Sequence, residues 1–111
     1  ENCPDTRNSK VVDIINRLRE YDIQPVVTDP WADAEVAKQA YGVDLVPFDA
    51  IPKADCVIVA VGHGEFRALS LMQLRDLFKS ELSNDERVLI DVKSLYRMDE
   101  LKASGLRFWR L

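Results

Sequence analysis

Residues 56–61 (CVIVAV) constrain the fold more than any other segment of this 111-residue chain. All six side chains are apolar, whereas a strand with one face in water alternates apolar and polar side chains. An uninterrupted apolar run of this length is typical of a central strand in a parallel sheet that helices cover on both faces. We therefore expect an α/β fold in which Cys56 is a buried, small hydrophobic residue.

Helical patterns and short β-rich runs alternate on both sides of this segment. Helices are predicted for residues 10–21, 33–41, 70–82 and 98–103, and strands for residues 24–28, 43–48, 87–92 and 106–110. Asp33 and Ser70 are expected N-caps, and Gln73 completes a capping box with Ser70. Gly42 and Gly105 are expected to end helices. This order predicts a Rossmann-like, doubly wound, mostly parallel sheet with helices on both faces.

The order begins with a helix, whereas a doubly wound unit usually begins with a strand. We therefore expect the first strand to be missing from the chain, so that residues 1–9 form the loop that follows it. The length is right for one compact domain. We expect a single domain, residues 1–111, that is a fragment of a larger enzyme.

The composition argues against several classes of partner. The net charge is −4, and Lys and Arg are scattered, so no nucleic-acid surface is expected. No apolar run approaches the roughly 20 residues that span a bilayer, so no membrane partner is expected. Cys3 and Cys56 lack neighbours at metal-ligand spacing. We expect no metal site and a reduced, cytoplasmic protein.

Open α/β sheets bind ligands outside the carboxyl ends of their strands. This rule selects four segments, residues 1–9, 28–33, 61–67 and 91–95. The polar and aromatic side chains that they offer are Asn2, Asp5, Arg7, Asp29, Trp31, His63 and Lys93.

The first of these segments, ENCPDTRNS, contains no glycine and so cannot be a dinucleotide-binding G-x-G-x-x-G turn. It does place Arg7 beside a helix N-terminus, a combination suited to phosphate oxygens. An ion pair of Arg7 with Asp5 or Glu1 explains the residue equally simply. From the residues alone, the ion pair is slightly favoured.

The other candidates also have ordinary structural explanations. Lys93 at the end of a strand is more often a solvated charge than a ligand, and Asp29 before Pro30 is most often a turn former. His63 in G-H-G is a candidate base by residue type, yet a single loop histidine is usually a hydrogen-bonding residue rather than a base. No Ser/His/Asp or Cys/His constellation is present. On these residues alone the function stays open.

The order of the longer motifs adds a resemblance. ENCPDTRNSKVVDI, VVTDPWAD, ADCVIVAVGHGEF, LIDVKSLY and GLRFWRL together resemble the C-terminal, UDP-binding domain of the UDP-glucose/GDP-mannose dehydrogenase family, almost from end to end. The E-N-C-P-D-x-R-N loop is most similar to that of the bacterial UDP-N-acetylgalactosamine and UDP-N-acetylglucosamine 6-dehydrogenases. Relatives that oxidise UDP-glucose usually carry D-x-R-E-S there.

The resemblance implies an NAD-dependent oxidoreductase that converts C6 of a UDP-sugar to a carboxylate, in capsule or O-antigen polysaccharide biosynthesis. It implies an N-terminal domain that binds most of the NAD, a middle region with the catalytic cysteine, and a homodimeric parent protein. Neither G-x-G-x-x-G nor that cysteine is present here, and Cys3 belongs to the UDP-domain loop. The fragment alone is therefore expected to have no catalytic residue and no activity.

The resemblance also implies roles for individual residues. Arg7 matches the loop arginine that approaches NAD, and Lys93 matches a basic residue that contacts the sugar or phosphate of the substrate. A lysine provides a point charge where an arginine would give a bidentate fork. His63 lies where relatives often have His or Trp, and Asn2, Asp5 and Asp29 are expected only to line the site.

Two alternatives remain. The first is a non-catalytic α/β nucleotide-binding module that has kept the scaffold without the chemistry. The second is a response-regulator-like signalling domain, which needs clustered acidic residues around Mg²⁺ at strand ends. Asp29 and Asp91 alone do not supply such a cluster.

Overall fold

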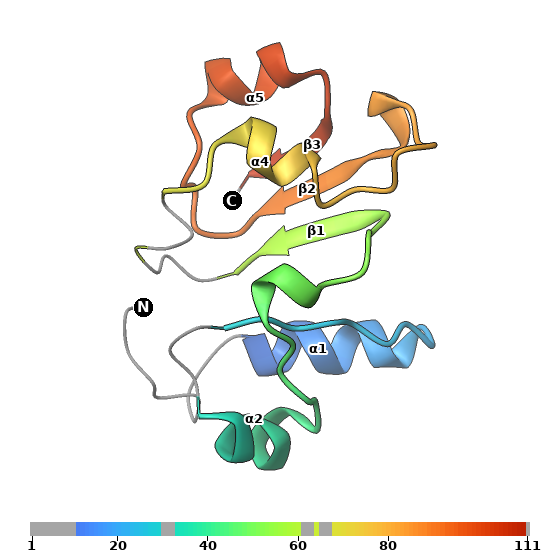
Figure 1. Ribbon diagram of the computed structural model, residues 1–111, viewed down its shortest axis with the longest axis vertical. Coiled ribbons are helices and arrows are strands. Elements are labelled where there is room, and N and C mark those ends of the chain that lie inside the picture. Colours follow the sequence, from blue (N-terminus) through green and yellow to red (C-terminus); the bar gives the residue numbers. More distant parts are fainter. Residues whose placement is uncertain (1–10, 30–32, 61–63, 65–67, 111) are drawn as a thin grey trace. The chain divides into compact units, whose positions relative to one another are not determined.

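The computed structural model describes residues 11–29, 33–60, 64 and 68–110 (Figure 1). The chain forms two compact units, Glu1–Ile51 and Pro52–Leu111. Each unit has its own cluster of buried hydrophobic side chains, so the two are described in turn as unit 1 and unit 2.

The first described element of unit 1 is helix α1, Val11–Glu20, which confirms the helix predicted there. The helix ends without a glycine. Asp22 takes the left-handed conformation with φ 60°, and the N–H of Ile23 donates to the carbonyl of Leu18 at 3.0 Å. This bond spans five residues, as in a Schellman motif, with aspartate where glycine is usual.

Helix α2, Ala34–Tyr41, follows the predicted caps closely. One carboxylate oxygen of Asp33 accepts the N–H groups of Glu35 and Val36, at 2.9 and 3.1 Å. Gly42 ends the helix with φ 67°, and its N–H donates to the carbonyl of Lys38. The guanidinium of Arg19 in turn donates to the carbonyl of Gly42 at 2.8 Å, which ties the end of α2 to α1.

The prediction of two extended strands in unit 1 was wrong. Residues 24–28 and 43–48 meet only in one parallel bridge, Val27↔Leu45, supported by Val46 N–H donating to the Val27 carbonyl at 2.9 Å. Pro47 has no N–H with which to extend the pairing, and the chain then turns into the 3-10 helix η1, Phe48–Ala50.

Unit 2 contains a three-stranded parallel sheet in the order β1-β2-β3, with a helix between each pair of consecutive strands (Figure 1). The parallel sheet and its flanking helices confirm the predicted Rossmann-like α/β class. The elements are β1 Cys56–Val59, α4 Leu71–Arg75, η2 Asn84–Glu86, β2 Val88–Asp91, α5 Met98–Ser104 and β3 Arg107–Arg110.

The position of β1 differs from the prediction made from its apolar run. Within this sheet β1 lies at an edge and β2 at the centre. Cys56, the first residue of β1, is exposed rather than buried. Its apolar sequence therefore overstated how fully the start of the strand is covered. β2, with the mixed sequence VLID, is the strand that pairs on both sides.

Helix α4 starts as predicted and ends early. Ser70 and Gln73 form the capping box, with Ser70 N–H to Gln73 Oε1 at 2.8 Å and Gln73 N–H to Ser70 Oγ at 3.2 Å. The helix ends at Arg75 rather than near residue 82. Beyond it, Phe78 forms a parallel bridge to Ala54, and the hydrogen bonds Ala54 N–H to Leu77 carbonyl and Lys79 N–H to Ala54 carbonyl replace helical ones.

The core of unit 2 lies between one face of the sheet and its two helices. Leu89 of the central strand is fully buried, and its register partners Val57 and Phe108 pack in the same cluster. Leu74 from α4 and Leu101 from α5 complete it. Because side chains alternate along a strand, Asp91 shares the face of Leu89, and it is also fully buried.

Candidate functional site at the end of the central strand

The clearest candidate site in unit 2 is the turn that follows β2. We call residues 92–95 the β2–α5 turn, because they join the end of β2 at Asp91 to the segment leading into α5. Val92 N–H donates to the Val59 carbonyl at 3.0 Å, so the turn leaves the sheet beside the end of β1. This is the carboxyl end of two neighbouring parallel strands, where open α/β sheets bind ligands.

Asp91 fixes the far end of this turn. Its Oδ1 accepts the N–H of Leu95 at 3.0 Å, and its Oδ2 accepts the N–H of Tyr96 at 2.9 Å. Aspartate commonly closes turns by bonding to backbone N–H groups a few residues ahead. Here the carboxylate is fully buried, so both bonds lie away from water, where an unpaired charge would be costly.

Tyr96 joins this turn to the residues that precede α4. Its side chain is 7% exposed and packs in the hydrophobic core, and its hydroxyl donates to the Leu69 carbonyl at 3.1 Å. Burial, followed by the negative charges of Asp91 and Glu100, raises the pKa of Tyr96 to about 12. The hydroxyl therefore remains a protonated donor throughout the physiological range.

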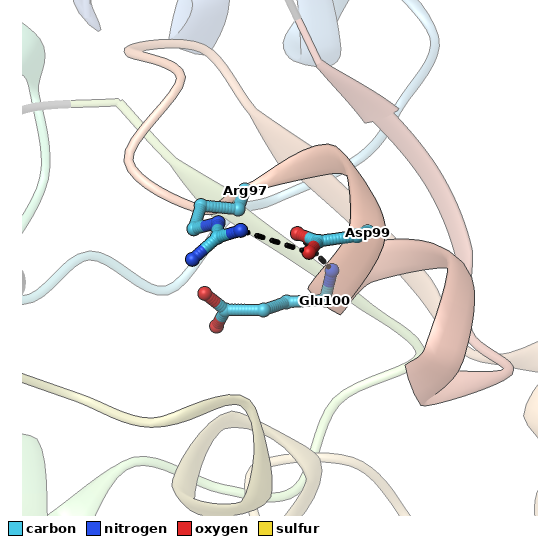
Figure 2. A network of polar contacts seen from close by, with 3 residues as sticks. All are labelled: Arg97, Asp99 and Glu100. Carbon is cyan, nitrogen blue, oxygen red and sulfur yellow. Dashed lines mark hydrogen bonds and ion pairs between the residues drawn. The ribbon is translucent and has the colours of Figure 1, made fainter.

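Helix α5 starts at Met98, shortly after this turn, with a small polar network (Figure 2). Arg97 is the N-cap residue and its side chain makes no capping bond. Asp99 performs part of that function, accepting Glu100 N–H at 2.9 Å and the Arg97 guanidinium at 3.0 Å. Both charged side chains are largely exposed, so the pair adds little stability. The network shapes the start of the helix rather than a binding site.

Lys93 occupies the β2–α5 turn and is exposed. Ser94, which follows it, has φ 54°, a left-handed backbone conformation that residues other than glycine rarely adopt. Lys93 thus lies in a turn whose two ends are fixed by hydrogen bonds. This arrangement fits the predicted substrate contact, which remains a prediction.

Asp29 is the other predicted site residue that the structure describes. It is half-buried and lies in unit 1, two residues beyond the Val27 bridge. Lys93 belongs to unit 2. The remaining candidates, Asn2, Asp5, Arg7, Trp31 and His63, lie outside the described residues.

The described residues do not form a metal centre. No group of three or more His, Cys, Asp or Glu side chains suited to a metal ion occurs among them. Both oxygens of Asp91, one of the two acidic residues considered with the signalling-domain alternative, accept backbone N–H groups. Partial desolvation, then the charge of Asp55, raises the pKa of Cys56, which disfavours a reactive thiolate there.

Two of the described helix N-termini, those of α2 and α4, do not fit the diphosphate of NAD. Such a site needs free N–H groups and no competing negative charge. At α2 the Asp33 carboxylate already accepts these N–H groups, and at α4 the capping box of Ser70 and Gln73 closes the N-terminus.

In the parts of the chain that the structure describes, no helix is both long and apolar enough to cross a membrane.

Sequence reasoning named Asp91 only as an acidic residue at a strand end and gave no role to Tyr96 or Leu69. It therefore missed how these three residues organise the turn. A signal for Asp91 was present, because an aspartate at the end of a buried strand, directly before a turn, often bonds to the backbone ahead of it. No comparable signal marked the bond of Tyr96 to Leu69, which joins residues 27 positions apart.

Comparison with known proteins gives the family. Residues 1–98 match the UDP-glucose/GDP-mannose dehydrogenase family, UDP binding domain. The chain belongs to this family, as the motifs predicted, and the match runs through both units.

Individual relatives agree with this assignment. The chain is 45% identical over 103 residues to UDP-N-acetyl-D-glucosamine 6-dehydrogenase of Pseudomonas aeruginosa, covering 93% of this chain and 23% of that protein. It is 37% identical to protein CapL of Staphylococcus aureus over 111 residues, 100% of this chain and 24% of the relative. It is 36% identical over 95 residues to UDP-N-acetyl-D-glucosamine 6-dehydrogenase of Salmonella typhi, covering 84% of this chain and 21% of that protein. The chain thus spans less than a quarter of these relatives.

Proposed function

We propose that this chain, residues 1–111, is one UDP-sugar-binding domain of an NAD-dependent nucleotide-sugar 6-dehydrogenase. The observation that carries the proposal is the family match over residues 1–98. The parent enzyme oxidises a UDP-N-acetylhexosamine to its uronic acid for capsule or O-antigen biosynthesis. It is a cytoplasmic homodimer whose other domains hold most of the NAD and the catalytic cysteine.

The choice of an N-acetylhexosamine over a hexose is supported by the relatives. Identity is 45% and 36% to two UDP-N-acetyl-D-glucosamine 6-dehydrogenases, and 28% to the UDP-glucose 6-dehydrogenase of Rhizobium meliloti. The E-N-C-P-D-x-R-N loop points the same way. UDP-hexose is the second candidate substrate.

Lys93 is the described residue best suited to the substrate. Its ammonium carries three donors on a flexible stem and can neutralise a diphosphate or bond to a sugar hydroxyl. It is exposed at the carboxyl end of the central strand, the edge at which this class of sheet binds ligands. Arg7 is proposed to act on the NAD side of the same enzyme. Asn2, Asp5, Asp29 and His63 are proposed only to line the site.

An assay of the complete gene product tests the proposal directly. NADH formation is measured with UDP-N-acetylglucosamine, UDP-N-acetylgalactosamine and UDP-glucose. We expect turnover of at least one UDP-N-acetylhexosamine with NAD and a lower kcat/KM for UDP-glucose. Binding of UDP without NADH formation from any of the three sugars would instead identify a non-catalytic nucleotide-binding module.

Two substitutions test the proposed residues. Lys93→Ala should raise the KM for the UDP-sugar about 10- to 100-fold, the loss expected for a hydrogen bond to a charged group. Lys102→Ala, which removes an exposed lysine from α5, is the matched control and should leave KM unchanged. Arg7→Ala should raise the KM for NAD or lower kcat. Unchanged kinetics would instead support the explanation that Arg7 only forms a structural ion pair.

A further inference from the structure

Asp91 is the one charged side chain that is fully buried among the described residues. Burying a carboxylate is unfavourable unless hydrogen bonds replace its water. Both replacing donors come from the backbone of a single short segment, Leu95 and Tyr96. The charge is therefore used to hold one particular piece of backbone.

The segment that it holds is the one that carries Lys93. Val92 is fixed to β1 on one side of Lys93, and Leu95 and Tyr96 are fixed to Asp91 on the other. Between these points Ser94 is in the left-handed conformation, which is strained for a residue other than glycine and persists only where the surroundings impose it. Without the Asp91 carboxylate, the turn has a strained residue and two unsatisfied N–H groups.

We propose that Asp91 is a positioning residue: its buried carboxylate holds the β2–α5 turn in the conformation that presents the Lys93 ammonium to the anionic diphosphate of the ligand. The inference rests on the proposed function, because it takes Lys93 as a ligand contact. A lysine side chain loses considerable rotamer freedom on binding. A backbone fixed in advance reduces the further ordering that binding requires.

Substitutions at Asp91 separate this role from a purely structural one. Asp91→Asn keeps the size of the side chain and leaves one oxygen to accept an N–H, while its amide nitrogen cannot accept the other. The dissociation constant for UDP is measured with the complete gene product for wild type, Asp91→Asn, Lys93→Ala and the double variant. Thermal unfolding of each protein is measured in parallel.

The expected result is a loss of affinity that depends on Lys93. Asp91→Asn should weaken UDP binding about tenfold through lost preorganisation. In the double variant the two losses should be far from additive, since residues that act as a unit couple in such a cycle. Leu106→Val changes a core residue directly before β3, at the end of the parallel sheet opposite the β2–α5 turn. It is the stability control and should lower Tm without changing UDP affinity.

The outcomes are distinguishable. A wild-type protein that does not bind UDP overturns both the proposed function and this inference. Binding by wild type, with a folded Asp91→Asn that binds equally well, overturns the positioning role and leaves the function intact. Fully additive losses of UDP affinity in the double variant also overturn the positioning role. If Asp91→Asn does not fold, Tyr96→Phe carries the test, because it removes the bond to Leu69 and should weaken binding in the same Lys93-dependent way.

Discussion

The two units of the chain are stabilised in different ways. Of the described hydrophobic residues, three are buried in unit 1 (Ile15, Ala37 and Val43) and seven in unit 2. Unit 1 is held largely by local devices, namely the Asp33 cap, the Gly42 end, the Arg19 bond and one β-bridge. Unit 2 has a three-stranded sheet and a larger core. A turn that must keep one shape is therefore better supported in unit 2, where Lys93 lies.

The largest expected effect on stability comes from truncating a core side chain in each unit. Leu89→Ala removes a fully buried side chain from the central strand, and we expect a loss of about 2–5 kcal/mol in the free energy of unfolding. Ile15→Ala should lower the stability of unit 1 first, because few other buried side chains support it. Urea titration with residue-resolved amide exchange distinguishes the two. Equal loss of protection in both units after Ile15→Ala would show that they unfold together and would break the comparison.

A smaller effect is expected at the two glycines that end α2 and α5. Gly42 and Gly105 have φ of 67° and 77°, so either change to alanine should cost about 1–2 kcal/mol. Gly105→Ala should cost more, because its new Cβ would lie 3.0 Å from Asn84 Nδ2, and Asn84 is held by Arg75 at 3.0 Å. At Gly42 the neighbour is the end of the flexible Arg19 side chain, at 3.2 Å.

Asparagine sharpens this comparison, because it tolerates the left-handed conformation and still carries a Cβ. Chemical denaturation should show that Gly42→Asn recovers much of the loss, whereas Gly105→Asn does not. Equal recovery at both sites would mean that φ alone, and not the contact with Asn84, sets the cost at Gly105.

The smallest expected effect concerns the Tyr96 hydroxyl. Tyr96→Phe should cost about 1 kcal/mol at neutral pH, the usual contribution of one hydrogen bond. The pKa of Tyr96 is raised in the folded state to about 12, above the ordinary value of about 10. Its contribution is therefore complete below pH 10 and lost as the pH rises toward 12. The difference in stability between wild type and Tyr96→Phe, measured across this range, should shrink. A constant difference would contradict the raised pKa.

Local signals predicted much of the fold, because they depend on a few adjacent residues. The caps at Asp33 and Ser70 and the ends at Gly42 and Gly105 all occur where the sequence indicates. The early end of α4 was not predictable in this way. It follows from the pairing of Phe78 with Ala54, and no property of residues 76–82 alone announces that partner.

The candidate site shows the same limit. Its location at the end of β2 follows from the rule for parallel sheets, and Lys93 is predicted there from the sequence alone. The scaffold around it depends on burial and on distant pairs. From the sequence, Asp91 is one of two acidic residues that fall short of a Mg²⁺ cluster, and only its two backbone bonds reveal a structural charge.

The edge strand β3 has a consequence for self-association. Within the described sheet it bonds to β2 alone, and Trp109 on it is 55% exposed. An unpaired strand edge of this kind invites pairing with another chain. Arg107 and Arg110 are both exposed in the same four-residue strand. In two molecules brought edge to edge, these guanidinium groups would meet like charges, so β3 carries its own protection against strand addition and the aggregation that would follow.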